Sequence, residues 1–562
     1  MTSVFNTTAM QVGVKGSDVY TASGIENPLV ALSALLVRGA SEDLIRQGLD
    51  AVLASGRPED VEDAFVLAFQ TRDIRGGKGE RDLFQKMLLY FLEHKHHVAI
   101  AILELVPEYG CWDDLYKITD QRALKKVIDI TVQQLKNDLA TPAEKSISLC
   151  AKWAPREDRS ALLAKMMAKL LFPEEANISR RLKAYRKLVV GLNKRLQTTE
   201  VMMCARTFAE IEPAKVPGRC LQKNMKAFLN EQGNRPNAIH VGRGRLRYPD
   251  DADRMECRQH FQDHFAKSAK GEAKVNGSKT VFPHELVKKA INIPTDAKDE
   301  KNGVLGVWKQ MVKDAKDGGG LGRSIAMCDF SGSMHSSGPN GDTPYWVSMA
   351  MGLLIAETCS EEFKDSFLTF DSNPTLHTMS PDADLFERLA TISHLGQGTS
   401  TDFQKAMDLV LARLKETRCR PGQEPENLIV LTDMNWDQAC SSSMVSPYSG
   451  NRYRHVVKTD PWQTHVEMIR EAFKRAGEDM WGAPLKMPRI VIWNIASTST
   501  DFHAKTDTEG VVMLSGWSPS LFKILQEEGP DGVKALTPLM ALRMQIDTER
   551  YGPVRMAVRG AM

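Results

Sequence analysis

Oxygen-bearing side chains of the kind that ligate hard metal ions recur at three places in the C-terminal half of the sequence. The segment DFSGSM (residues 329–334) has the spacing DxSxS, which places one carboxylate and two hydroxyls around a single turn. A threonine follows in GQGTSTDF and a second aspartate ends LIVLTD. Carboxylates and hydroxyls, with waters completing an octahedron, suit Mg²⁺ or Mn²⁺. We therefore expect one divalent metal ion to be held by Asp329, Ser331, Ser333, Thr399 and Asp433; the alternative is a turn whose hydroxyls cap a helix.

The elements expected around these residues are buried strands that alternate with amphipathic helices. The apolar runs that indicate strands are SIAMCD (324–329), SFLTF (366–370), LIVLTD (428–433), RIVIWNI (489–495) and GVVMLSG (510–516). Continuous apolar strands separated by helices predict a doubly wound, mainly parallel α/β sheet. Ligands of such sheets bind at the carboxyl ends of the strands, where both aspartates are expected.

A long polar and aromatic segment follows the second aspartate. Loops at the ligand edge of such a fold determine which partner binds. The candidate partner-binding rim consists of Trp436, Tyr448, Arg452, Tyr453 and Arg454.

The residue pattern of the first half of the chain is typical of successive helices. Apolar residues recur at helical spacing over 41–54, 121–139, 142–153, 160–171 and 179–192, among other stretches. Short helices in series predict an all-α, HEAT-like solenoid. We expect this domain over residues 1–293, with a loop-rich stretch near 233–280, a linker over 294–321, and the α/β domain with a C-terminal tail over 322–562.

Basic residues are concentrated in one part of this helical half. Between residues 152 and 247 there are 21 Lys and Arg against 8 Asp and Glu, although the whole chain carries only +2. Such an excess favours a polyanionic partner; the alternative is helix faces that are simply solvated. Arg180, Lys183 and Lys187 share one face of the helix expected over 179–195. The other candidate RNA-binding cations of this stretch are Arg243, Arg245 and Arg247.

The glycine-rich segment RDIRGGKGER (72–81) invites a phosphate-loop interpretation, which its spacing does not support. No strand precedes it, and no Ser or Thr follows Lys78. A glycine turn at the start of a helix can still present amides to a phosphate, with Arg75 and Lys78 nearby. The alternative is an inter-helix turn whose charges pair with one another.

The bulk composition excludes several classes of protein. No apolar run is long enough to span a bilayer, and the N-terminus lacks the basic and apolar segments of a secretory signal. Nine dispersed cysteines without a CxxC pair indicate reduced thiols rather than disulfides or zinc, so we expect a cytoplasmic location.

The metal motif resembles that of a known domain family. DFSGSM, GTSTDF and LTDM look like the metal-ion-dependent adhesion site of von Willebrand factor A domains. The resemblance implies that the five residues named above ligate the metal, that a protein partner supplies an Asp or Glu to it, and that the domain is not catalytic.

The N-terminal half extends the resemblance to nearly the whole chain. RDIRGGKGERDLF, PEYGCWDDL, SLCAKWAPRE, YRKLVVGLNKRL and FPHELV resemble a family of uncharacterised proteins from plants, bacteria and large viruses. Its domain order is similar to that of the Ro autoantigen, or TROVE, proteins, in which HEAT-like helices bind structured small noncoding RNA. The resemblance implies a non-enzymatic RNA-binding protein. The alternatives are a scaffold that assembles proteins through metal-bridged carboxylates, and a virus- or phage-associated structural protein.

Overall fold

The chain divides into two compact units that do not follow the order of the sequence. The computed structural model describes residues 10–12, 18–232, 246–336, 338, 341–360, 363–371, 373–393, 395, 403–434, 461–526 and 536–562. The α/β unit comprises Met1–Ala64, Phe282–Ile291 and Val312–Asp547. The helical unit comprises Phe65–Val281, Asn292–Met311 and Thr548–Met562.

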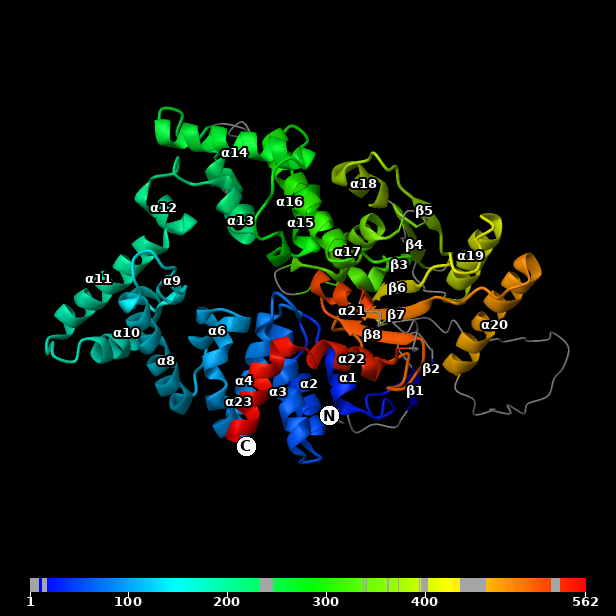
Figure 1. The fold of residues 1–562 in the computed structure, drawn as a ribbon, viewed down its shortest axis with the longest axis horizontal. Helices are drawn as coiled ribbons and strands as arrows, with labels where there is room; N and C mark the ends of the chain where they lie inside the picture. The colour runs from blue at the N-terminus through cyan, green and yellow to red at the C-terminus, as the bar shows by residue number, and fades with distance from the viewer. Residues whose placement is uncertain are drawn as a thin grey trace. The chain divides into compact units, whose positions relative to one another are not determined.

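A six-stranded sheet forms the centre of the α/β unit (Figure 1). Its strands, in spatial order, are β5 (Leu376–Thr378), β4 (Ser366–Phe370), β3 (Ser324–Asp329), β6 (Asn427–Thr432), β7 (Arg489–Asn494) and β8 (Val511–Ser515). All neighbours pair in parallel except β5, which is antiparallel to β4 at the edge. The expected doubly wound, mainly parallel sheet is therefore present, with one antiparallel strand added.

The α/β unit also contains helices, several of which pack on the strands of the sheet. They are α1 (Pro28–Leu35), α2 (Glu42–Leu53), α15 (Pro283–Asn292), α17 (Pro344–Thr358), α18 (Leu385–Ile392), α19 (Phe403–Glu416), α20 (Pro461–Trp481), α21 (Lys523–Gln526) and α22 (Pro538–Ile546). Helix α17 packs closely on strand β3, because a Cβ atom at Gly352 would lie 2.3 Å from Cys328 Sγ. A separate hairpin pairs β1 (Met10–Val12) with β2 (Asp18–Tyr20).

The N-terminal segment belongs with the sheet rather than with the helical unit. Helix α1 packs against β8, where Ser515 Oγ donates to the carbonyl of Ser33 at 2.6 Å. Asn494 Nδ2, at the end of β7, donates to the carbonyl of Ala34 at 3.1 Å. This division differs from the expected boundaries at 293 and 322, because apolar and polar contacts with the sheet, not sequence order, decide which unit a helix joins.

The helical unit consists of short helices in series. They are α4 (Arg81–His94), α5 (His96–Ala101), α6 (Val106–Tyr109), α7 (Trp112–Leu115), α8 (Gln121–Ala140), α9 (Cys150–Trp153), α10 (Glu157–Leu171), α11 (Ile178–Leu196), α12 (Thr199–Ala205), α13 (Gly218–Phe228), α14 (Ala252–Lys270) and α23 (Gly552–Ala561). Helices α3 (Pro58–Arg72) and α16 (Lys298–Asp317) each run from one unit into the other. Short 3₁₀ helices occur at Leu103–Leu105, Pro213–Lys215, Ser278–Thr280, Gly332–His335, Pro519–Phe522 and Glu549–Tyr551.

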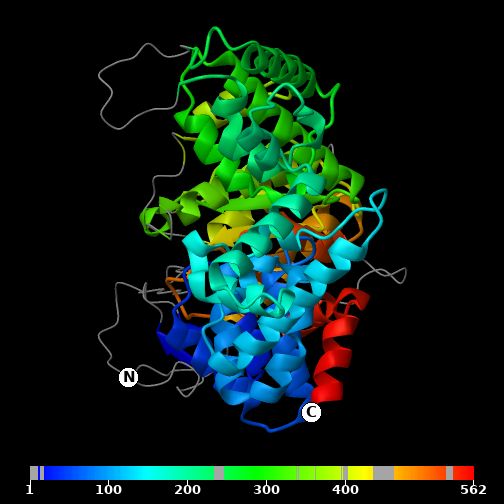
Figure 2. The ribbon, with the colours of Figure 1, turned by 90° about the vertical axis from the view of Figure 1, so that its left-hand side faces the viewer.

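The C-terminal helix α23 is part of the helical unit, although it follows the sheet in sequence. It packs beside α5, and in Figure 2 it is the red helix that ends at the C-terminus. Just before it, Arg550 pairs with Asp73, whose Oδ1 accepts from Arg550 Nη2 at 2.8 Å. The hydroxyl of Tyr551 also donates to Asp73, at 3.2 Å. Asp73 is fully buried, so these contacts fix the end of the chain in place.

Two expectations about irregular structure need correction. The stretch 233–280 was expected to be loops, yet Ala252–Lys270 forms the 19-residue helix α14, capped by Asp251 and ended by Gly271. Its buried residues, Cys257, Phe261 and Phe265, repeat every four positions but are outnumbered by charged ones, which weakens the sequence signal. The expected linker 294–321 is mostly the 20-residue helix α16.

Two further findings bear on the class of protein. Within the ranges given above, no helix is both long enough and apolar enough to cross a bilayer. No disulfide joins any two of the eight cysteines in those ranges.

Candidate functional site

The carboxyl ends of β3 and β6 bring the two expected aspartates to one edge of the sheet. The parallel register pairs Cys328 with Leu431, so Asp329 lies beside Thr432 and one residue before the level of Asp433. The hydroxyl of Thr432 donates to Asp329 Oδ2 at 3.2 Å. Both carboxylates are fully buried. We call this region, with Asp329, Ser331, Ser333 and Asp433, the metal edge.

The turn after β3 adds the two serine hydroxyls to this edge. Asp329 Oδ1 accepts a hydrogen bond from the backbone N–H of Ser331 at 2.9 Å, which folds the turn back over the strand end. The hydroxyls of Ser331 and Ser333 then lie 3.1 Å apart. The two hydroxyls thus lie beside one another on a turn that the Asp329 carboxylate holds. Carboxylate and hydroxyl oxygens are the donor set of a hard divalent cation, so the residue types present fit Mg²⁺ or Mn²⁺.

The loop that carries the second aspartate is held by a histidine that the sequence did not single out. Met434, directly after Asp433, has a positive φ of 67°, which is uncommon for a residue with a side chain. Its carbonyl accepts a hydrogen bond from Nε2 of the buried His503 at 3.0 Å. Burial lowers the pKa of His503 from 6.5 to about 4, so the ring is neutral at physiological pH. The sequence around residue 503 contains no pattern that predicts this contact with Met434.

Several expected residues lie outside the described ranges. They are the fifth expected metal ligand, Thr399, the candidate rim residues Trp436, Tyr448, Arg452, Tyr453 and Arg454, and the cations Arg243 and Arg245. Among the residues that are described, no group of three or more His, Cys, Asp or Glu could hold a metal ion. The expected ligand set consists mostly of hydroxyls and holds only two carboxylates, so it is not a group of that kind.

The basic residues of α11 lie on the outer face of that helix. Asn177 caps its N-terminus, and the apolar side chains of Leu182, Tyr185 and Val189 face the core. Arg180, Lys183 and Lys187 are all exposed. Within the described residues, these three side chains form no ion pair with an acid. We call them the α11 basic face; Figure 1 shows α11 next to α10, against which it packs.

The other candidate cations differ in exposure. Arg75 is exposed and lies 3.7 Å from a carboxylate oxygen of Glu108. Arg247 is also exposed, and its guanidinium carbon lies 5.2 Å from the ring centre of Tyr248. Lys78, in contrast, is only 1% exposed, and burial lowers its pKa to about 7. Lys78 therefore does not contribute to an exposed basic surface.

The glycine turn around Lys78 connects helices α3 and α4 and has a structural role. The backbone N–H groups of Gly77 and Gly79 both donate to the carbonyl of Asp73, each at 3.1 Å. A Cβ atom at Gly77 would lie 1.8 Å from the carbonyl oxygen of Gln70, so only glycine fits there. The alternative interpretation of RDIRGGKGER, a turn between helices, accounts for this geometry.

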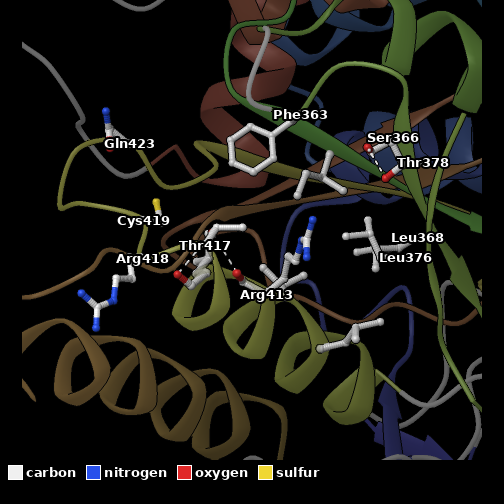
Figure 3. A pocket seen from close by; sticks show the side chains of 14 residues that line it. Phe363, Ser366, Leu368, Leu376, Thr378, Arg413, Thr417, Arg418, Cys419 and Gln423 are labelled. Carbon is white, nitrogen blue, oxygen red and sulfur yellow. Dashed lines mark hydrogen bonds between the residues drawn. The ribbon is translucent and has the colours of Figure 1, made fainter. Parts of the chain in front are cut away.

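One cavity of the α/β unit lies beside the sheet, between α19 and the edge strands. Its volume is about 240 Å³ (Figure 3). Leu368, Val410 and Leu414 contribute to an apolar wall, and the hydroxyls of Ser366 and Thr378 lie 3.1 Å apart on its rim. Arg413 extends its guanidinium into this space, and no acid occurs among the described residues that line it. This cavity, called the α19 cavity below, has the chemistry of an apolar pocket with a cationic rim.

Two family models match parts of the chain. One, described as a domain of unknown function (DUF7788), matches residues 323–545, and another (DUF2828) matches residues 119–238. The first match includes all five expected metal ligands. The second includes the α11 basic face.

Comparison with individual proteins gives more extended similarities. The chain is 27% identical over 493 residues to "Uncharacterized protein L728" of Acanthamoeba polyphaga mimivirus, covering 83% of this chain and 77% of that protein. Among solved structures it is similar to the Ro (RSR) protein of Deinococcus radiodurans, with a TM-score of 0.38 and 13% identity, covering 89% of this chain and 99% of that one.

Proposed function

We propose that this chain is a non-enzymatic RNA-binding protein. Its helical unit binds structured RNA, and its metal edge binds a carboxylate of a protein partner. The observation that carries the proposal is the α11 basic face. Three exposed cations without acidic partners in the described residues keep their full charge available for phosphates, whereas cations in surface ion pairs are already partly compensated.

The rest of the helical unit supports contact with the RNA backbone rather than with base sequence. Around α11, Lys165, Lys169 and Lys194 are exposed as well. Among the candidate cations that the structure describes, only Arg247 lies against an exposed aromatic ring, that of Tyr248. Phosphate contacts supply affinity with little sequence information, and double-stranded RNA is recognised mostly by its shape and backbone. A structured RNA fits this surface better than a specific single-stranded sequence.

The proposed role of the metal edge rests on its donor set. Carboxylate and hydroxyl oxygens from Asp329, Ser331, Ser333, Asp433 and, by the resemblance to A domains, Thr399 would hold Mg²⁺ or Mn²⁺. A bound cation would supply an attachment point for an Asp or Glu of a partner. That this edge binds a partner rather than catalysing a reaction is what the resemblance to A domains implies.

A filter-binding titration with a structured RNA tests the RNA half of the proposal. Replacing Arg180, Lys183 and Lys187 by Glu should weaken binding at least tenfold at physiological salt. The slope of log affinity against log salt should flatten by roughly 3, because about 0.9 counterion is released per phosphate neutralised. The melting temperature should change little, since exposed charges contribute little to stability.

The matched control replaces three exposed cations of the same unit that already pair with acids. In Arg122→Glu, Lys126→Glu and Lys215→Glu the change in net charge is identical, but the original partners are Asp120, Glu104 and Glu212. We expect the control to retain affinity within about threefold. If the wild type does not bind RNA, or if both triple variants lose it equally, the proposal fails and the scaffold alternative takes its place.

A further inference from the structure

A second cavity of the α/β unit lies at the opposite end of the strands from Asp329 and Asp433. It has a volume of about 450 Å³, within the usual range of small-molecule sites. The residues just before or at the start of β3, β6, β7 and β8 line it, so it sits at the amino ends of the strands. Its walls are apolar, formed by prolines together with Leu485 and Met487. We call it the amino-edge cleft.

The charged groups of this cleft are mostly positive. Five cations line it, namely Arg323, Arg470, Lys474, Lys486 and Arg489. Only two acids do so, and both are engaged. Glu424 is buried and accepts hydrogen bonds from the backbone N–H groups of Gly422 and, at 3.0 Å, of Lys486. Glu426 forms an ion pair with Arg323. The cleft therefore carries an excess of positive charge over an apolar wall.

One of these cations is oriented by a hydrogen-bonded row that crosses three strands. The register places Ser324, Asn427 and Arg489 side by side, as the first residues of β3, β6 and β7. Arg489 Nε donates to Asn427 Oδ1 at 2.7 Å, and Asn427 Nδ2 donates to Ser324 Oγ at 3.1 Å. Ser324 in turn donates to the carbonyl of Leu321 at 2.5 Å. Ser324 and Asn427 are buried, so the row sets the plane of the Arg489 guanidinium before any ligand arrives.

A second cation comes from a different element. Arg470, on α20, is exposed, and its Nη2 would lie 3.9 Å from a Cβ atom at Gly510, the residue before β8. Its guanidinium thus lies close to the start of β8. A planar guanidinium forms two parallel hydrogen bonds with phosphate or carboxylate, and it keeps its charge at any physiological pH.

We propose that the amino-edge cleft binds a small organic phosphate whose apolar body packs on the proline and leucine wall. The excess of several cations matches a dianionic phosphate monoester better than a single carboxylate. The apolar walls favour an organic ester over the free inorganic ion. Strand β3 extends from Ser324 to Asp329, so at about 3.3 Å per residue the cleft lies roughly 17 Å from the metal edge and is a separate site.

Calorimetric titration with 1-naphthyl phosphate tests the proposal, with 1-naphthol as the matched ligand that lacks the phosphate. The wild-type chain should bind one equivalent of 1-naphthyl phosphate and bind 1-naphthol at least tenfold more weakly. Arg470→Glu should weaken binding of the phosphate at least tenfold. Arg489→Lys, which keeps the charge but loses the planar fork, should weaken it severalfold without unfolding the protein.

Two control variants distinguish this cleft from general surface charge and from the α19 cavity. Arg475 lies on the same helix as Arg470 but pairs with Glu471 and does not line the cleft, so Arg475→Glu should bind within about twofold of wild type. Arg413→Glu, in the α19 cavity, should do the same. Absence of saturable binding by the wild type would overturn the proposal. Equal losses in Arg470→Glu and Arg475→Glu, or loss in Arg413→Glu alone, would overturn it as well.

Discussion

Asp329→Ala should abolish the stabilisation of the α/β unit by Mg²⁺. A ligand that binds only the folded state stabilises it by RT ln(1 + [L]/Kd), which is about 2.7 kcal/mol at a hundredfold excess over Kd. The α/β unit has about 310 residues, and at about 2.1 cal/mol/K of unfolding entropy per residue each kcal/mol moves its melting temperature by about 1.5 °C. We therefore expect Mg²⁺ or Mn²⁺ to raise the melting temperature of the wild type by roughly 4 °C, and that of Asp329→Ala by almost nothing.

The melting temperature without metal should change much less, because two effects of the substitution oppose each other. Alanine removes the acceptor of two hydrogen bonds, from the Ser331 N–H and from the Thr432 hydroxyl, which contribute about 1 kcal/mol each. It also removes a fully buried negative charge close to Asp433, whose burial is unfavourable in the absence of a cation. The loss of metal response is thus separable from a loss of folding.

Thermal melts over a Mg²⁺ series measure both quantities at once. Asp329→Asn keeps the shape and the acceptor for Ser331 but loses the charge, so it should fold normally and respond weakly. Asp382→Ala removes an exposed aspartate of the same unit and serves as the matched control. An unchanged Mg²⁺ response in Asp329→Ala would refute the metal assignment, as would an equal loss of response in Asp382→Ala.

Further predictions concern stability. His503 stays neutral in the folded chain down to about pH 4, whereas the unfolded chain protonates it near pH 6.5. Unfolding therefore takes up a proton between these pH values, and the free energy of unfolding should fall by about 3 kcal/mol as the pH drops from 6.5 to 4. Urea melts of His503→Gln should show a shallower pH dependence than wild type over that window, and equal dependence would contradict the assignment. Gly77→Ala should destabilise the helical unit by roughly 3 kcal/mol, because the new Cβ meets the carbonyl of Gln70. Gly191 lies on the exposed side of α11 with open space around it, so Gly191→Ala should stabilise the helical unit by roughly 0.5–1 kcal/mol. If denaturant melts show Gly77→Ala to be more stable than Gly191→Ala, the close packing described around Gly77 is wrong.

The sheet was predictable because its strands are buried on both faces. The runs SIAMCD and SFLTF correspond residue for residue to β3 and β4, since continuous burial leaves a continuous apolar signal. Strand β5 was not predicted, because it is three residues long and only partly buried at the edge. The expected helix over 142–153 is helical only from Cys150. Ser148 bonds through both its N–H and its hydroxyl to Asp138, which competes with helix formation.

Residues of the site could be predicted only where a side chain that can ligate a metal follows the end of a predicted strand. Asp329 and Asp433 each follow an apolar run, so their meeting at one edge follows from the parallel topology. The burial of Lys78 depends on tertiary packing, and nothing in its neighbourhood distinguishes it from the exposed Arg75. The hydrogen bonds that join Ser324 and Asn427 could not be predicted either, because these residues become neighbours only through the strand register.

The metal edge and the amino-edge cleft share strands β3 and β6, so whether they influence one another can be argued from charge. At roughly 17 Å and an effective dielectric constant of 20, two unit charges interact by about 1 kcal/mol. Without a metal, the buried carboxylates of Asp329 and Asp433 repel an anion at the cleft, and a divalent cation held between them would cancel most of that field. Saturating Mg²⁺ should therefore strengthen binding of the dianionic 1-naphthyl phosphate severalfold at low salt, with a smaller gain at high salt because charges are screened. A loss of affinity, or a gain that is equal at low and high salt, cannot come from this field and would show that metal binding shifts the strands themselves.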